Sequence, residues 1–142
     1  MTDTLSMVTG RPVWQRGIIA AVIGAIASIV ILLVSNAAMS GSVQVPKSVG
    51  SKSLVDLNVG QLIGAVVISL VIGTVIALLM HRKGLGGKAP MVFGILIVLS
   101  LISPLMISGA TAGTRVALIL MHLVVGAAAI ALLGPTRAPA AA

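Results

Sequence analysis

Long apolar stretches without an internal charge alternate with short polar segments along the chain. Four of these stretches predict transmembrane helices, at about residues 17–38, 60–80, 90–107 and 115–133. With a rise of about 1.5 Å per residue, the first would cover roughly 33 Å, enough for the ~30 Å hydrocarbon core of a bilayer. Backbone polar groups in lipid need partners within the protein, so the pattern predicts an all-α membrane protein, an antiparallel up-and-down bundle of four transmembrane helices. We expect residues 1–142 to form a single membrane domain.

The predicted helices carry recognisable start and stop residues. Asn58 or Asp56 can cap the second helix, and Pro90 fits the first turn of the third, where a missing N–H costs nothing. Gly134 ends the fourth helix. The tail at 134–142 is rich in Ala and Pro and is expected to be mobile.

The connections between the predicted helices differ in length and character. Residues 39–58 are rich in Ser, Gly and Val and are long enough for an extended or hairpin-like excursion at the membrane surface. Residues 81–89 form a short basic turn, and residues 108–114 form a short polar one. Such short turns place successive helices antiparallel.

The composition restricts the chemistry that is open to this chain. Of the 142 residues, 58% are hydrophobic and 8% are charged, and the mean hydropathy is +1.24, which is typical of a membrane protein. Asp3 and Asp56 are the only carboxylates and cysteine is absent, which leaves no carboxylate pair or thiol nucleophile for catalysis. We expect no enzymatic activity, and neither a catalytic residue, a metal nor a cofactor.

The basic residues predict the orientation in the membrane. Nine Lys and Arg side chains give a formal net charge of +7, but with one Trp and one Phe for base stacking, nucleic acid is not an expected partner. Six of the nine lie on the side of the chain ends: Arg11, Arg16, Arg82, Lys83, Lys88 and Arg137. The opposite side carries three: Lys47, Lys52 and Arg115. The positive-inside rule then predicts that both termini are cytoplasmic.

The N-terminal segment admits a second interpretation. Arg11 and Arg16, an apolar run, and then Ser35, Asn36 and Ala37 resemble a secretory signal peptide with small residues at its cleavage site. The run is longer than the ~7–15 residues of a usual signal-peptide core. A retained membrane anchor is therefore the favoured prediction.

Small residues recur at helical spacing in the first two predicted helices. Six of them make up the predicted helix-packing face: Ala65, Ser69, Gly73, Ala77, Gly24 and Ser28. Because lipid supplies no hydrophobic driving force between helices, small residues mark the faces where two backbones can approach closely. We expect these rows to pack within the bundle, and a dimerisation face is the alternative.

His122 is the only ionisable side chain well inside a predicted helix. Such a residue is costly in hydrocarbon, so we expect it to face the bundle interior, on one helix face with Arg115, Gly126 and Ala129. The opposite face is expected to meet lipid, and it consists of Val116, Leu120, Leu123, Ala127 and Ile130.

Nearby polar groups complete a candidate polar core around this histidine. The predicted partners of His122 are the hydroxyls of Ser100 and Ser103, or carbonyl groups that Pro104 leaves without a backbone donor. Asp56 is the one carboxylate with which Arg115 could pair on the outer side.

Two interpretations of the candidate polar core stay open. In the structural one, neutral His122 donates a hydrogen bond between the third and fourth helices and fixes their rotation. In the functional one, the imidazole marks a proton, substrate or cofactor position in a cavity open toward Arg115. Bis-histidine haem ligation is not expected, because His81 lies at the cytoplasmic end of the second helix.

Two parts of the chain resemble a known family. Residues 99–133, with SLISPL followed by TRVALILMHLVVGAAAIALL, and residues 13–34 are similar to small four-helix membrane proteins that are common in actinobacteria and catalogued as a domain of unknown function. The most specific positions are Ser100, Leu101, Pro104, Leu105, Leu120, Met121 and His122. The resemblance implies four helices, a bacterial inner (plasma) membrane location and a place for His122 in the family pattern. It implies no activity.

These observations predict an integral membrane accessory or interaction protein, which meets the lipid bilayer and either another membrane protein or itself. The alternative is a small transporter or sensor with a polar cavity at His122 and Arg115. Beyond His122 the fourth helix offers only Gly126 and the alanines at 127–129, and so no polar side chain that continues a path across the membrane. The accessory role is therefore the favoured prediction.

Overall fold

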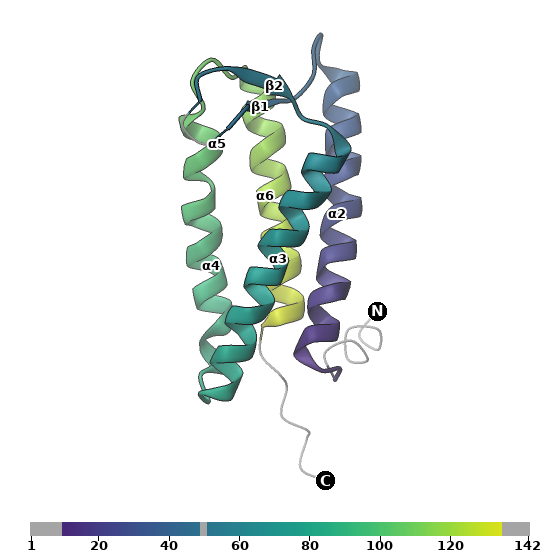
Figure 1. The fold of residues 1–142 in the computed structure, drawn as a ribbon. Helices are drawn as coiled ribbons and strands as arrows, with labels where there is room; N and C mark the ends of the chain where they lie inside the picture. The colour runs from purple at the N-terminus through teal and green to yellow at the C-terminus, as the bar shows by residue number, and fades with distance from the viewer. Residues whose placement is uncertain (1–9, 49–50, 135–142) are drawn as a thin grey trace.

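The computed structural model describes residues 10–48 and 51–134, and within them the chain is mostly helical (Figure 1). Two short strands and one 3₁₀ turn connect the helices. In chain order the elements are α2 (Val13–Ala38), β1 (Gln44–Pro46), β2 (Leu54–Asp56), α3 (Val59–Arg82), η1 (Gly86–Lys88), α4 (Ala89–Ser100), α5 (Ile102–Met106) and α6 (Ala112–Leu133). The predicted mobile tail falls almost wholly outside the described residues.

The prediction of four helices that are long and apolar enough to cross a membrane is confirmed. The third of these spans consists of η1, α4 and α5 in succession, over Gly86–Met106. Each helix begins or ends a few residues away from the predicted position. α2, for instance, begins at Val13 and so includes Arg16, which the sequence placed before the span.

Local side chains determine where α3 begins. Asn58 is the N-cap, and its side-chain oxygen accepts a hydrogen bond from the backbone N–H of Gln61 at 2.9 Å. The side chain of Gln61 accepts in return from the backbone N–H of Asn58 at 3.3 Å, which completes a capping box. Of the two predicted caps, Asn58 is therefore the one used, and Asp56 belongs to β2.

Pro104 interrupts the third span near one end. A proline has no N–H to donate to the carbonyl of Ser100, and α4 ends at that residue. The helix resumes at Ile102 as α5, because Leu101 keeps a right-handed helical backbone with φ −70° and ψ −18°. The interruption is therefore a local break in hydrogen bonding within one span.

The connection between α2 and α3 forms an antiparallel hairpin. β1 pairs with β2 in the register Gln44 to Asp56, Val45 to Val55 and Pro46 to Leu54. Figure 1 shows this hairpin across one end of the helices, which we call the hairpin end. Two hydrogen bonds attach it to the helices, since the N–H of Val43 donates to the Asn36 side chain at 2.9 Å and the N–H of Gln44 to the Thr114 hydroxyl at 3.5 Å.

The four long helices lie side by side, and consecutive ones run in alternating directions in Figure 1. α6 is the most buried of them, and it packs extensively against α2 and against α4. α3 packs mainly on α2 and makes few contacts with α4. It slants across the other helices, so that α3 and α4 approach near the turn that joins them and separate toward the hairpin end (Figure 1).

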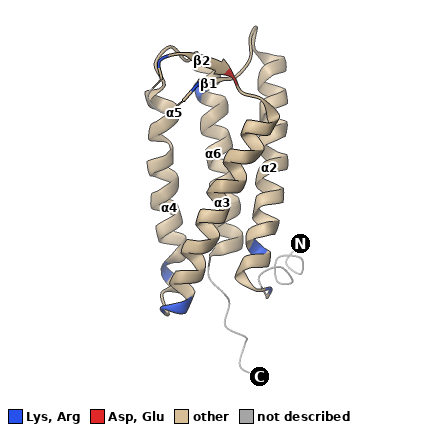
Figure 2. Cartoon of the chain, viewed as in Figure 1, with Lys and Arg blue, Asp and Glu red and all other residues tan. Residues whose placement is uncertain are grey.

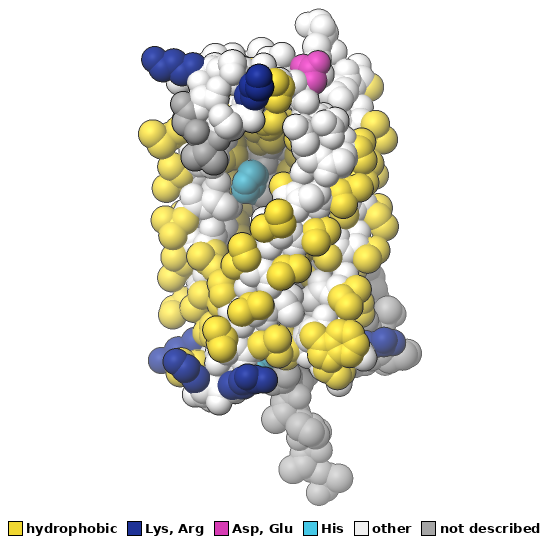
Figure 3. Space-filling model, viewed as in Figure 1, with side chains coloured by type: hydrophobic (Ala, Val, Ile, Leu, Met, Phe, Trp, Pro, Cys, Tyr) yellow, Lys and Arg dark blue, Asp and Glu magenta, His cyan; other side chains and the backbone are white. Residues whose placement is uncertain are grey.

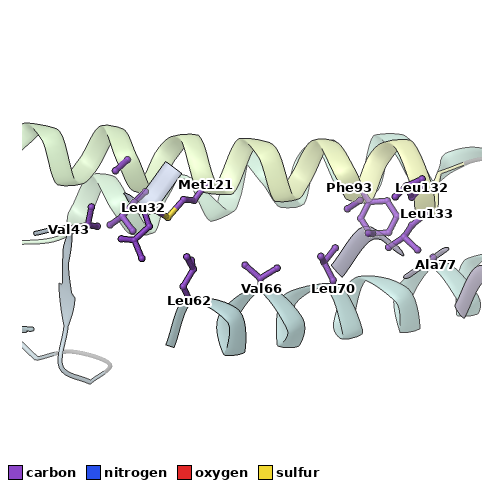
Figure 4. Packing of buried hydrophobic residues seen from close by; sticks show 14 of the residues in the cluster. Leu32, Val43, Leu62, Val66, Leu70, Ala77, Phe93, Met121, Leu132 and Leu133 are labelled. Atoms are coloured by element: carbon purple, nitrogen blue, oxygen red, sulfur yellow. The ribbon is translucent and has the colours of Figure 1, made fainter. Parts of the chain in front are cut away.

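Buried apolar side chains fill the space around α6. Figure 4 shows Leu62, Val66 and Leu70 pointing from α3 toward α6, and Phe93, Ala77, Leu132 and Leu133 gathered at one end. We call this second group the basal cluster. Its members are all at most 5% exposed, so this end of the molecule is tightly closed.

The outer surface of the helices is apolar as well. Large hydrophobic side chains such as Ile26, Ile68 and Val98 are exposed by 59%, 62% and 66%. In Figure 3 such side chains cover the visible middle of the molecule, and charged side chains lie toward its two ends. An exposed apolar surface of this extent suits a hydrocarbon solvent.

Candidate functional site

A cavity of about 360 Å³ lies between the helices on the side where α3 and α4 separate. Figure 3 shows this face hollowed between the two helices, with a histidine side chain visible in the hollow. Most of the wall is apolar. The residues that line it are Ser28 of α2; Val45 and Leu57 beside the hairpin; Leu62, Ala65, Val66, Ser69, Leu70 and Gly73 of α3; Leu96, Ile97 and Ser100 of α4; and Leu118, Met121, His122, Val125, Gly126 and Ala129 of α6.

His122 lies near the middle of α6. At about 1.5 Å per residue it lies roughly 15 Å from the start of the 22-residue helix α6 at Ala112. Its Nδ1 lies 2.7 Å from the carbonyl oxygen of Leu118, one turn earlier in the same helix. Because a carbonyl only accepts, Nδ1 donates this bond, and Nε2 is left for another partner.

The predicted partners of His122 are arranged differently from the expectation. Ser100 lines the same cavity, but its hydroxyl donates to the carbonyl of Ile97 at 2.7 Å. Ser103 is exposed on α5, and Pro104 is buried outside the cavity wall. The hydrogen bond from Nδ1 to Leu118 lies within α6. Among the described residues, it takes the place of the predicted bond from His122 to the third span.

Ser28 is a polar residue buried at the wall of the cavity. Its side chain is 0% exposed, and its hydroxyl has no hydrogen-bond partner among the described residues. Ser69, which also lines the cavity, donates to the carbonyl of Ala65 at 2.8 Å in the usual manner of a helical serine. An unpartnered buried hydroxyl costs free energy, so Ser28 offers an unused donor and acceptor.

Arg115 and His122 share one helix face, but the structure does not bring their side chains into one site. Arg115 lies outside the cavity wall, near the hairpin end, and its guanidinium donates to the carbonyl of Ile107 at 3.2 Å. Asp56, its predicted ion-pair partner, accepts instead from the side chain of Gln44 at 3.3 Å. The cavity at His122 is therefore lined without any charged side chain from the described residues.

A family model described as a family of unknown function (DUF6069) matches residues 8–139. The chain belongs to this family. The predicted resemblance to a domain of unknown function is thus confirmed, while the actinobacterial origin stays a prediction. Comparisons with curated proteins and with solved structures gave no match.

Within the described part of this DUF6069 protein, no three metal-ligating side chains come together. His81 is at the opposite end of the molecule, in the last turn of α3, and its ring packs against Gly86 of the following turn. Four polar side chains, those of Ser28, Ser69, Ser100 and His122, line the same cavity. This cavity has the size and the apolar lining of a small-molecule site.

The predicted packing face is only partly used for packing between helices. Gly24, Ser28, Gly73 and Ala77 are buried, and a methyl group added at Gly24 would come within 3.5 Å of both α3 and α6 side chains. Ala65 and Ser69, in the same row as Gly73, are exposed and line the cavity. Near the basal cluster, this row of small residues therefore packs against other helices. Toward the hairpin end, the same row borders the cavity.

Arg16 is a buried residue that the sequence interpretation misplaced. From the sequence it counts among the basic residues beside the ends of the spans, but its side chain is 0% exposed and lies inside the protein. Its Nε donates to the carbonyl of Leu132, and its Nη2 donates to the carbonyl of Gly134 at 2.9 Å. Arg16 thereby caps the last turn of α6, whose carbonyls have no partner within their own helix. Arg16 immediately precedes the apolar run in the sequence, and this adjacency was the one signal that it could belong to the helix.

Proposed function

We propose that this protein is an integral protein of the bacterial plasma membrane that crosses the bilayer four times as an antiparallel up-and-down bundle, with both termini in the cytoplasm. Figure 2 supports the orientation. Arg11, Arg82, Lys83 and Lys88 are exposed at the end opposite the hairpin, which we call the basic end, whereas Lys47 and Lys52 are exposed near the hairpin. The excess of basic residues favours a cytoplasmic basic end.

The absence of cysteine from the chain allows a direct test of this orientation. Single substitutions Lys83→Cys and Ser48→Cys place one thiol at each end of the molecule. In intact cells, a membrane-impermeant maleimide should label the Ser48→Cys protein at once and the Lys83→Cys protein only after the membrane is opened. Labelling of Lys83→Cys in intact cells would reverse the proposed topology.

Within the membrane we propose a non-enzymatic binding role, in which the cavity at His122 takes up an apolar molecule from the bilayer. The observation that carries this proposal is the opening between α3 and α4, which leads from the lipid-facing surface to an apolar wall with an unpartnered, buried Ser28. Apolar cavities bind apolar guests readily, and a few polar groups then select among them.

Binding or sensing fits the cavity better than transport across the membrane. The cavity ends at Gly73 and Ala129, and beyond these residues the basal cluster closes the space between the helices. A transport path would need polar side chains that continue toward the basic end, and the apolar basal cluster supplies none. A guest can therefore enter and leave from the side.

The accessory role predicted from the sequence has support of its own in a second groove. Trp14, Gly17, Ala21 and Val71 contribute to a groove between α2 and α3 on the lipid-facing surface. A helix of another membrane protein or of a second copy could pack there against small residues. Cysteine crosslinking from Ala21→Cys in membranes, with Ile72→Cys as the matched lipid-facing control, tests this second candidate. A dimer specific to Ala21→Cys supports it, and equal crosslinking contradicts it.

Occupancy of the cavity can be measured by photolabelling. In lipid nanodiscs, an apolar diazirine probe should label peptides that line the cavity. Ala65→Trp fills the space and should abolish this labelling. Ile72→Trp adds the same side chain to the lipid-facing surface of the same helix, where Ile72 is 56% exposed, and should leave the labelling intact. Equal cavity labelling of both variants would contradict the binding role.

A further inference from the structure

The hydrogen-bonding groups of the cavity restrict the chemistry of its guest, and this inference rests on the binding role proposed above. Four polar side chains line the cavity: Ser28, Ser69, Ser100 and His122. The hydroxyls of Ser69 and Ser100 already donate to carbonyls of their own helices. Each keeps only acceptor capacity toward a guest.

His122 is the polar group best placed to orient a guest. Its Nδ1 donates to Leu118, so the tautomer is decided by a bond within α6. No carboxylate lines the cavity to pair with an imidazolium, and an unpaired charge at this depth is costly. With Nδ1 as the donor to Leu118, Nε2 is the acceptor that this tautomer offers, and it needs a donor from the guest.

The remaining wall excludes a charged guest. Neither Lys nor Arg lines the cavity, so an anionic headgroup would lose its hydration without a counter-charge. Most of the wall consists of apolar side chains, such as Leu62, Val66 and Leu70 of α3, which can cover a hydrocarbon chain. Such a wall, which offers Nε2 of His122 and the serine oxygens as acceptors, suits a neutral, elongated molecule.

We propose that the cavity binds an uncharged, long-chain lipid alcohol or phenol, whose hydroxyl donates a hydrogen bond to Nε2 of His122. The apolar chain lies against the α3 wall and leaves the cavity through the opening between α3 and α4. Ser28 also lines this wall, and its hydroxyl has no hydrogen-bond partner among the described residues. The hydroxyl thus distinguishes this guest from the bulk acyl chains of the bilayer.

A matched pair of probes tests the hydroxyl directly. The first is a diazirine derivative of dodecanol, and the second is its methyl ether, which keeps the chain but cannot donate. In lipid nanodiscs, where no alkyl detergent competes, the wild-type protein should bind the alcohol roughly fivefold to tenfold more tightly than the ether. In His122→Phe this preference should disappear, whereas His81→Phe should retain it.

Two further comparisons keep the outcome unambiguous. His122→Gln supplies an amide oxygen as acceptor and should restore part of the preference, provided that its thermal unfolding matches the wild type. Ser103→Ala removes an exposed hydroxyl outside the cavity and should change nothing. If the alcohol and the ether label the cavity equally in the wild type, the hydroxyl proposal is overturned while the binding role stands. If neither probe labels the cavity, the binding role fails and the hydroxyl proposal fails with it.

Discussion

Arg16 shows how one side chain can join two helices that are far apart in the sequence. The end of α6 leaves carbonyl groups without backbone donors, and in a membrane protein few waters reach such a place. The guanidinium of Arg16, from the first turns of α2, supplies two donors to the carbonyls of Leu132 and Gly134. It therefore holds the start of α2 against the end of α6.

Replacing this arginine should weaken the fold strongly. In Arg16→Met the buried carbonyls lose both donors, and we expect the free energy of unfolding to fall by about 3 kcal/mol. Arg11→Met removes the same charge from the same end of the molecule, at an exposed position, and should change stability little. Thermal unfolding of both variants in nanodiscs measures the difference. Equal stability of the two would contradict the capping role of Arg16.

Gly17 is a second residue whose size matters for the contact between two helices. A methyl group added there would overlap Oγ1 of Thr74 and lie 2.9 Å from Cγ2 and 3.1 Å from Cβ of the same residue. Because Thr74 is β-branched and its hydroxyl is bonded to the carbonyl of Leu70, its side chain cannot move aside freely. The close approach of α2 and α3 at this point therefore depends on glycine.

We expect Gly17→Ala to destabilise the protein by about 2 kcal/mol, as overpacking of a tight contact does. Gly64→Ala is the matched control in α3, because nothing lies within 4 Å of its added methyl group. The control should be neutral or slightly stabilising, since alanine favours helix. Chemical or thermal unfolding distinguishes them, and a neutral Gly17→Ala would show that α2 and α3 can separate at little cost.

At the scale of elements, the tilt of α3 creates the cavity and the hairpin covers it. Val45 and Leu57, at the hairpin, contribute to the cavity wall. The hairpin consists of two strands of three residues, so it depends on attachments to the helices and on side-chain hydrogen bonds. The hydrogen bonds that the side chains of Ser42 and Gln44 donate to Asp56 lower the pKa of this exposed carboxyl group.

This lowered pKa predicts how the hairpin responds to acid. A carboxylate with a lower pKa in the folded state stabilises that state above its unfolded pKa, near 4, and loses this effect as the pH falls through the folded value. We expect the backbone chemical shifts of Val45 and Val55 to move away from hairpin values below about pH 4. Asp56→Asn cannot titrate and should show no such step. An identical pH profile in the variant would contradict the prediction.

At the scale of the whole molecule, the protein has an apolar interior and an apolar exterior. Helices α2, α3 and α6 are hydrophobic nearly all round, which is expected where the surrounding solvent is lipid. Charged side chains lie toward the two ends of the molecule in Figure 3, and four polar side chains line the cavity. The exposed middle should therefore be intolerant of charge.

Ile68 tests this exterior, because it is 62% exposed and lies near the middle of α3. Ile68→Lys should disfavour membrane insertion by about 3 kcal/mol, the cost of a lysine at the centre of a spanning helix. Val59→Lys adds the same charge at the start of α3, where Val59 is 40% exposed, and should insert normally. The inserted fraction in isolated membranes measures both. Normal insertion of Ile68→Lys would contradict a lipid-facing α3.

The sequence alone was sufficient for the four spans and for several of their ends. Unbroken apolar runs longer than about 18 residues have few alternatives to a membrane helix. The cap at Asn58, the first-turn Pro90 and the stop at Gly134 were also readable, because capping acts between residues a few positions apart. Helix caps and membrane spans can both be predicted from short stretches of sequence, because each depends on residues that are close together in the chain.

The tertiary structure alone decided how far each predicted packing face is used and what the polar side chains contact. In lipid, buried and exposed positions are equally apolar, so the pattern that orients a helix in a soluble protein is missing here. The bond from His122 to Leu118 and those from Arg16 to Leu132 and Gly134 end on backbone carbonyls, which every residue possesses and no sequence motif marks. The cavity likewise follows from the tilt of α3 relative to α4, a relation between two helices that neither one encodes by itself.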